Sequence, residues 1–151
     1  MFDVRLAADT DLDGVAQVWH ASASLPGVAP PVIPTLEQLR HRVDEELVSG
    51  WKLFVAVCDE VVIGMLALNL SASEVAQIFV HPSHIGKRVG KALLQQAKLS
   101  MPNGFSLFTA STNQRAQQFY GREGLVFLRE SQNPRTGHLV KYYKWIGQPS
   151  L

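Results

Sequence analysis

The stretch that decides the fold is IFVHPSHIGKRVGKALL, residues 78–94, in which an apolar segment runs into a glycine-containing turn. Residues 78–80 are β-branched or aromatic, which suits a buried strand, and Pro82 cannot donate to a sheet ladder, so the strand ends before it. After Val89 the apolar residues recur close to helical spacing, with lysine and glutamine on the other side. The stretch therefore predicts a strand, a turn and a helix in succession.

The predicted turn has the features of an anion-binding site. Gly86 and Gly90 bracket a segment whose backbone N–H groups point out of the helix start, where unpaired donors and the helix dipole favour negative charge. Lys87, Arg88 and Lys91 add positive charge at the same place. We expect a phosphate or diphosphate to bind here. The alternative is a helix that begins near two glycines and exposes its lysines to solvent.

Strands and helices alternate along the rest of the chain. Period-2 or continuous apolar runs predict strands at residues 2–6, 53–58, 61–69, 74–80, 105–110, 125–128 and 139–145. Apolar residues at helical spacing predict helices over residues 12–19, 35–50, 89–101 and 114–122. The two strands around Asp59 and Glu60 form an expected hairpin. This order predicts an α/β fold with a mixed sheet and helices on both of its faces.

Capping residues mark where the first two helices begin. Asp9, Thr10 and Asp11 offer side-chain oxygens ahead of the first helix. Thr35 precedes the second helix and Gln38 follows three residues later, which is the pattern of a capping box. We expect both helices to start at these residues.

Length and composition set limits on the class of protein. The 151 residues fit one domain, residues 1–151, and 46% hydrophobic residues are enough for a real core. A net charge of +1 gives no support to a nucleic-acid or membrane partner. The N-terminus lacks the layout of a signal peptide, so a cytoplasmic location is expected. With one cysteine and no histidines beside acidic residues at ligand spacing, no metal site is expected.

A second block, NQRAQQFYGREGL at residues 113–125, joins the glycine turn in a larger pattern. Together the blocks resemble the GNAT superfamily of acyl-CoA-dependent N-acetyltransferases, whose signature is Arg/Gln-x-x-Gly-x-Gly/Ala after a strand ending Val-x-Pro. The second part of that pattern is Asn, Ala, an aromatic-Tyr pair and Gly-Phe, and the matching residues are Asn113, Ala116, Phe119, Tyr120 and Gly124. In the first block Gly90 matches the signature. Ile85 stands where the signature has Arg or Gln, and Arg88 stands where it has its first glycine.

The resemblance covers nearly the whole chain and implies a fold, a co-substrate and a site. The fold is a central, mostly antiparallel twisted sheet of six to seven strands flanked by about four helices, in the order β-α-α-β-β-β-α-β-α-β-β. The co-substrate is acetyl-CoA. The coenzyme-binding residues implied are Ile78, Phe79, Val80, Ile85, Gly86, Lys87, Arg88, Val89, Gly90, Lys91, Asn113, Phe119 and Tyr120.

Attack of an amine on a thioester needs a polarised carbonyl, an acceptor for the amine's protons and a proton for the departing thiolate. The resemblance implies that the carbonyl meets a backbone N–H where the strand at residues 78–80 diverges from its neighbour. Tyr120 is the expected general acid, because a phenol of pKa about 10 holds a proton at neutral pH. Glu74 is the expected general base. The alternatives are a core aromatic for Tyr120 and a solvated strand-end glutamate for Glu74.

The expected activity is transfer of an acetyl group from acetyl-CoA to a primary amine, by direct attack in a ternary complex. The acceptor is expected to be a small, weakly charged amine. Residues 28–33 are a candidate substrate loop, and the alternative is that they are a plain connector. Two rival hypotheses stay open: a non-catalytic acyl-CoA sensor of the same fold, and a protein that binds another phosphate-bearing ligand in the turn. A homodimer is possible, with the last strand and Trp145 as its edge.

Overall fold

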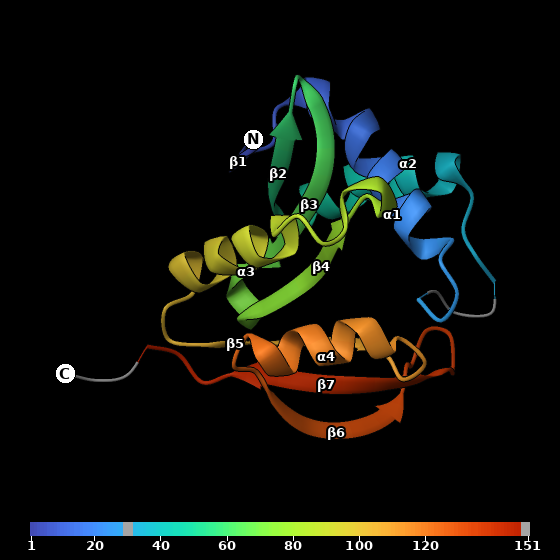
Figure 1. Ribbon diagram of the computed structural model, residues 1–151. Coiled ribbons are helices and arrows are strands. Elements are labelled where there is room, and N and C mark those ends of the chain that lie inside the picture. Colours follow the sequence, from blue (N-terminus) through green and yellow to red (C-terminus); the bar gives the residue numbers. More distant parts are fainter. Residues whose placement is uncertain (29–31, 149–151) are drawn as a thin grey trace.

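The computed structural model describes residues 1–28 and 32–148 and has one twisted sheet with helices on both faces (Figure 1). The strands in this part of the chain are β1 (Asp3–Leu6), β2 (Lys52–Cys58), β3 (Val61–Asn69), β4 (Glu74–Val80), β5 (Phe105–Ala110), β6 (Val126–Gln132) and β7 (Leu139–Trp145). The helices are α1 (Leu12–Ala23), α2 (Leu36–Val48), α3 (Val89–Ser100) and α4 (Gln114–Arg122). Three short 3₁₀ turns accompany them, η1 (Asp9–Asp11), η2 (Leu70–Ala72) and η3 (Pro82–His84). The predicted order of elements is confirmed.

The seven strands lie in the spatial order β1-β2-β3-β4-β5-β7-β6. Every neighbouring pair is antiparallel except β4 and β5, which are parallel. The mostly antiparallel sheet is therefore confirmed, and β4 is its central strand. The strand that precedes the glycine turn consequently lies in the middle of the sheet, between β3 and β5.

The hairpin between β2 and β3 closes through two left-handed residues. Asp59 has φ 50° and Glu60 has φ 67°, and positive φ at both central residues is the mark of a type I′ turn. The twist of such a turn matches the twist of the strands that it joins. An acidic pair is an uncommon choice here, yet it makes the two-residue connection that the sequence predicts.

The two faces of the sheet bury separate cores. On one face α1 and α2 cover Leu53, Val55, Met65 and Ala67. On the other face α3 and α4 cover strand residues that include Leu66, Leu68, Leu107 and Tyr143. Gly64 lets α3 approach β3 closely, because a Cβ there would lie 3.0 Å from Leu93 and 3.1 Å from Val89.

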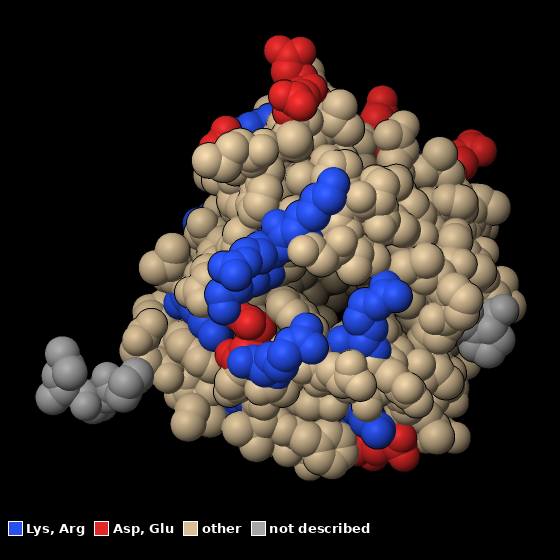
Figure 2. All heavy atoms as spheres, viewed as in Figure 1, with Lys and Arg blue, Asp and Glu red and all other residues tan. Residues whose placement is uncertain are grey.

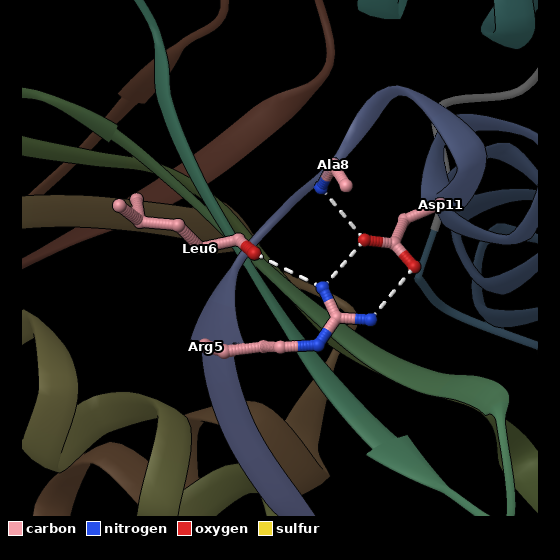
Figure 3. Close-up of polar contacts among 4 residues, drawn as sticks. All are labelled: Arg5, Leu6, Ala8 and Asp11. Carbon is pink, nitrogen blue, oxygen red and sulfur yellow. Dashed lines mark hydrogen bonds and ion pairs between the residues drawn. The ribbon is translucent and has the colours of Figure 1, made fainter.

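The first strand is tied to the first helix by an ion pair (Figure 3). The Arg5 guanidinium donates to both carboxylate oxygens of Asp11, at 2.7 and 3.0 Å, and the Ala8 backbone N–H donates to the same carboxylate at 2.7 Å. These contacts lower the pKa of Asp11, with the Arg5 hydrogen bond as the largest cause. Asp11 is the N-cap residue of α1, as predicted, but the expected side-chain cap is wrong, because its side chain makes no bond to the start of the helix. Thr35 does cap α2, and its box with Gln38 is confirmed.

The edge strands of the sheet are β1 and β6, not β7, and this corrects one prediction. β7 pairs with β5 on one side and with β6 on the other, so it has no free edge. Trp145 is 9% exposed and packs against Phe105 at 5.5 Å between ring centroids. Neither β7 nor Trp145 can therefore form the edge of a dimer.

Candidate active site

The central feature of the site is a gap between β4 and β5. The two parallel strands are in register only at Glu74 and Ser106, where the Ser106 N–H donates to the Ser73 carbonyl at 3.0 Å. Beyond this point they diverge, and the rest of β4 has a ladder partner only in β3. The sheet is thus open along one side of its central strand.

The register of β4 shows which of its backbone groups face the gap. The His81 N–H donates to the Ile63 carbonyl of β3 at 2.8 Å. Because the direction of N–H groups alternates along a strand, the N–H groups of Val80 and Ile78 point away from β3. The Val80 carbonyl agrees with this direction, since it accepts a hydrogen bond of 2.9 Å from Ser22 Oγ on α1. Two donors of β4 therefore face the open side.

The glycine turn follows β4 and places the start of α3 beside this gap. Gly86 has φ 86°, a conformation that favours glycine, and Arg88 is also left-handed with φ 66°. Among the described residues, no side chain caps α3. The backbone N–H groups of its first turn therefore have no side-chain oxygen as a hydrogen-bond acceptor. Gly90 lies against α4, because a Cβ there would be 3.4 Å from Phe119. The turn therefore offers backbone donors in a narrow space.

A cavity of about 550 Å³ lies along β4 between the helices. Figure 2 shows this face hollowed, with Lys and Arg side chains on both sides of the hollow. The basic residues that line the cavity are Arg42, Arg88, Lys91, Arg115, Arg122 and Arg135. Glu123 is the one acidic residue among the described lining residues, and Lys91 pairs with it at 3.4 Å. The cavity consequently favours anionic ligands.

Most of the residues predicted for the site line this one cavity. They are Ile78, Phe79, Val80, Ile85, Gly86, Arg88, Val89, Gly90, Lys91, Asn113, Phe119 and Tyr120. Lys87 is not among the lining residues. Glu74 lies elsewhere too: it lines a neighbouring cavity of about 320 Å³ that shares Ala76, Gln77 and other residues with the first.

Tyr120 projects from α4 and is only 5% exposed. Its ring packs against those of Phe119 and Tyr143, at 5.6 and 5.7 Å between centroids. Burial raises the pKa of Tyr120 well above the usual value of a phenol, and the charge of Tyr143 adds to the effect. The hydroxyl is therefore protonated at neutral pH. Asn113 caps the same helix, because its side chain accepts from the Ala116 N–H at 3.2 Å.

Glu74 lies at the closed end of the gap, where β4 and β5 still pair. Burial raises the pKa of its carboxyl group, and burial is the only cause of the shift. No ion pair links Glu74 to a cation in the described part of the chain. The carboxyl group is thus a stronger proton acceptor than a solvated glutamate.

Several cavity residues were not predicted from the sequence. They are Trp19 and Ser22 on α1, Arg42 on α2, Arg115 and Arg122 on α4, and Arg135 and His138 near the start of β7. Trp19 and Arg42 follow helical spacing and look like ordinary helix residues in the sequence. Their common location depends on how α1, α2 and β7 pack, and no local pattern reports that.

Across residues 1–28 and 32–148 no group of three or more His, Cys, Asp or Glu side chains is placed to hold a metal ion. Within the same residues no helix has the length and apolar character needed to cross a membrane.

An open central strand beside a donor-rich helix start is the arrangement expected of an acyltransferase that uses a coenzyme A thioester. Residues 49–124, half of the 151-residue chain, match the family model described as an acetyltransferase (GNAT) domain. The chain therefore belongs to the GNAT family of acetyltransferases. It is an acyltransferase of a family that uses acetyl-CoA, which sets aside the non-catalytic hypothesis. No curated protein matches the chain.

Solved structures show the same fold along almost the whole chain. YjaB from Escherichia coli is 18% identical with a TM-score of 0.71, over 98% of this chain and 99% of that one. A GNAT-family acetyltransferase from Bacillus cereus is 17% identical with a TM-score of 0.73, over 99% of each chain. YncA from Salmonella typhimurium, determined with its cofactor acetyl-CoA, is 14% identical with a TM-score of 0.72, over 100% of this chain and 96% of that one. At such identities the likeness shows the fold alone.

Proposed function

We propose that the protein transfers the acetyl group of acetyl-CoA to a primary amine, by direct attack of the amine in a ternary complex. The observation that carries the proposal is the gap between β4 and β5, which leads to the backbone donors of the glycine turn. An extended thioester arm fits beside β4, and its diphosphate suits the start of α3. Arg88 and Lys91 add positive charge at that end of the cavity.

The free N–H groups of β4 are suited to activating the thioester. Those of Ile78 and Val80 face the gap, where they would donate to acceptors on the thioester arm. A carbonyl that accepts such a bond is stabilised as negative charge develops on its oxygen. Because the donors belong to a paired strand, they need no rearrangement at the moment of attack.

Tyr120 is the residue proposed to stabilise the departing sulfur, and Glu74 is the residue proposed to accept the amine's proton. Burial raises the pKa of Tyr120, so its hydroxyl would donate a hydrogen bond to the departing sulfur while keeping its proton. Glu74 would accept the amine's proton, through water, because it lies at the opposite end of β4 from the glycine turn. The raised pKa of its carboxyl group favours that role. Attack of the amine forms the C–N bond, loss of the thiolate breaks the C–S bond, and the amine's proton leaves through the base.

The test is a Gly90→Glu substitution. A Cβ at position 90 already lies 3.4 Å from Phe119, and a carboxylate at the helix start would repel a diphosphate. We expect loss of acetyl-CoA binding by calorimetry and loss of acetyl transfer to an amine panel. Gln95→Glu is the matched control, because it adds the same charge on the exposed face of α3. A Gly90→Glu protein that binds acetyl-CoA as tightly as the parent protein contradicts the proposed site.

A further inference from the structure

Two arginines lie together at the end of the cavity away from the glycine turn. Arg42 comes from α2 and Arg135 from the connection between β6 and β7. Both also line the second cavity. The other lining residues include members of the first half of β4, as far as Gln77, but no residue of the glycine turn. Gly90 instead lies near Val80, at the other end of β4. The two arginines are therefore separate from the proposed diphosphate site.

Arg42 is held in place by apolar packing. Its guanidinium lies 5.3 Å from the centre of the Trp19 ring, and Trp19 in turn stacks on Phe79 of β4 at 6.4 Å. Its Nε atom is buried and has no hydrogen-bond partner among the described residues. A buried donor without an acceptor is costly unless a ligand supplies one.

The two guanidinium groups also repel each other. Burial is the main cause that lowers the pKa of Arg42, and the charge of Arg135 is the next. Glu46 and Glu45 oppose this shift, but their effects are smaller than that of Arg135. The site thus brings two like charges together, and Glu46 and Glu45 offset their repulsion in part.

No carboxylate of the described chain forms an ion pair with either arginine, although Glu46 and Glu74 line the same second cavity. Neither Arg42 nor Arg135 takes part in an ion pair, whereas Arg40, two residues earlier, pairs with Asp13 and Asp44 at 2.8 Å. Glu74 forms no ion pair with a cation among the described residues, and burial alone raises the pKa of its carboxyl group. An anionic ligand in this cavity would therefore meet two guanidinium groups that have no ion-pair partner among the described residues.

We propose that Arg42 and Arg135 bind the carboxylate of the acceptor, which is then an amino acid that carries both the attacking amine and that carboxylate. This inference rests on the proposed function and replaces the weakly charged amine expected from the sequence. Guanidinium groups suit a carboxylate because their N–H donors match its two oxygens. The walls beside Arg42 include Trp19, Leu39 and Phe79, which favour an apolar side chain on the acceptor.

The test compares leucine, methionine and phenylalanine with their carboxamides as acceptors, by following thiol release from acetyl-CoA. We expect kcat/KM for the acids to exceed that for the amides at least about 10-fold, because charge-assisted hydrogen bonds of this kind are worth that much. In Arg135→Gln we expect kcat/KM for the acids to fall about 10- to 100-fold and that for the amides to change less than about 3-fold. Arg135 is exposed on a turn, so this variant folds even if Arg42→Gln does not.

Arg40→Gln is the matched control, since it removes the same charge from α2 outside the cavity and should leave the acid preference unchanged. Equal use of acids and amides, acetylation of simple amines but of no amino acid, or a preference for phosphoethanolamine would each overturn the inference and leave the proposed function standing. If acetyl-CoA binds but no amine of any kind is acetylated, the proposed function fails instead, and this inference falls with it.

Discussion

Ser22 on α1 and Val80 at the end of β4 are joined by a hydrogen bond of 2.9 Å across 58 positions of sequence. Ser22 is 4% exposed, and its hydroxyl satisfies a carbonyl that the sheet leaves unpaired. We predict that Ser22→Ala lowers the free energy of unfolding by about 1–2 kcal/mol. Acetyl-CoA binding should also weaken, since the end of β4 loses its support.

The measurements are chemical denaturation and calorimetry. Ser24→Ala is the control, because the Ser24 hydroxyl bonds only to the His20 carbonyl of its own helix. A Ser22→Ala protein as stable as the parent, with unchanged affinity for acetyl-CoA, would show that this bond does not support the site.

Tyr120→Phe tests the proposed hydrogen bond from the tyrosine hydroxyl to the departing sulfur. We predict a fall in kcat of about 10²-fold, the usual size of such an effect, with acetyl-CoA affinity within about 3-fold of the parent value. Tyr143→Phe is the control, because Tyr143 packs on Tyr120 without lining the cavity. Unchanged turnover in Tyr120→Phe would remove the residue from the mechanism.

The same tyrosine predicts part of the pH profile. Because burial raises the pKa of Tyr120, the hydroxyl keeps its proton above the pH at which an ordinary phenol loses it. An ordinary phenol at this position would make turnover decline near pH 10, and the decline would be absent in Tyr120→Phe. We expect no such decline in the parent protein. A decline there that disappears in the variant would mean that the phenol ionises normally.

The Arg5–Asp11 pair predicts how stability depends on pH. The pKa of Asp11 is lower in the folded protein than in the unfolded chain, so its contribution is complete above the unfolded value of about 4 and is lost as pH falls through the folded value. Asp11→Asn should thus destabilise the protein at pH 7 by no more than about 1 kcal/mol, because solvent screens the half-exposed Arg5 side chain, and by much less near pH 2. Denaturation at both pH values measures this. An equal loss at both would mean that the charge of Asp11 contributes nothing.

Arg88 predicts a gain in stability. Its φ of 66° is unfavourable for a residue with a Cβ, so Arg88→Gly should raise the free energy of unfolding by about 0.5–1 kcal/mol. Lys87→Gly is the control, because Lys87 does not have positive φ and glycine there should destabilise. The comparison is made by denaturation without ligand. Equal losses in both variants would contradict the strain at Arg88.

The sequence predicts the elements well because each has a local signal. The apolar run at residues 78–80, the glycines after it and the Asp59-Glu60 turn all act within a few residues, and the structure confirms each element. Local patterns do not encode the order of strands. β7 lies between β5 and β6 although it comes last in the chain, and this is why the edge assigned to Trp145 was wrong.

The candidate site also contains residues that local sequence patterns predict and residues that they do not. The residues of the glycine turn and of α4 were predictable because each block is continuous in the sequence. Arg42 and Arg135 meet only through the packing of α2 against the sheet and the path of the β6–β7 connection. The side-chain cap expected from Asp11 was wrong because Arg5, on the preceding strand, takes the carboxylate that would have capped α1. The role of residues 28–33 stays a prediction: Val28 lines the cavity, and residues 29–31 lie outside the described part of the chain.

The single backbone register pair between β4 and β5 has a thermodynamic consequence. A ligand arm lying in the gap would act as an eighth strand, completing a ladder that joins β1–β4 to β5–β7. Amides of β4 that exchange with solvent in the empty protein should then become protected when acetyl-CoA binds, and the cooperativity of unfolding should rise with them.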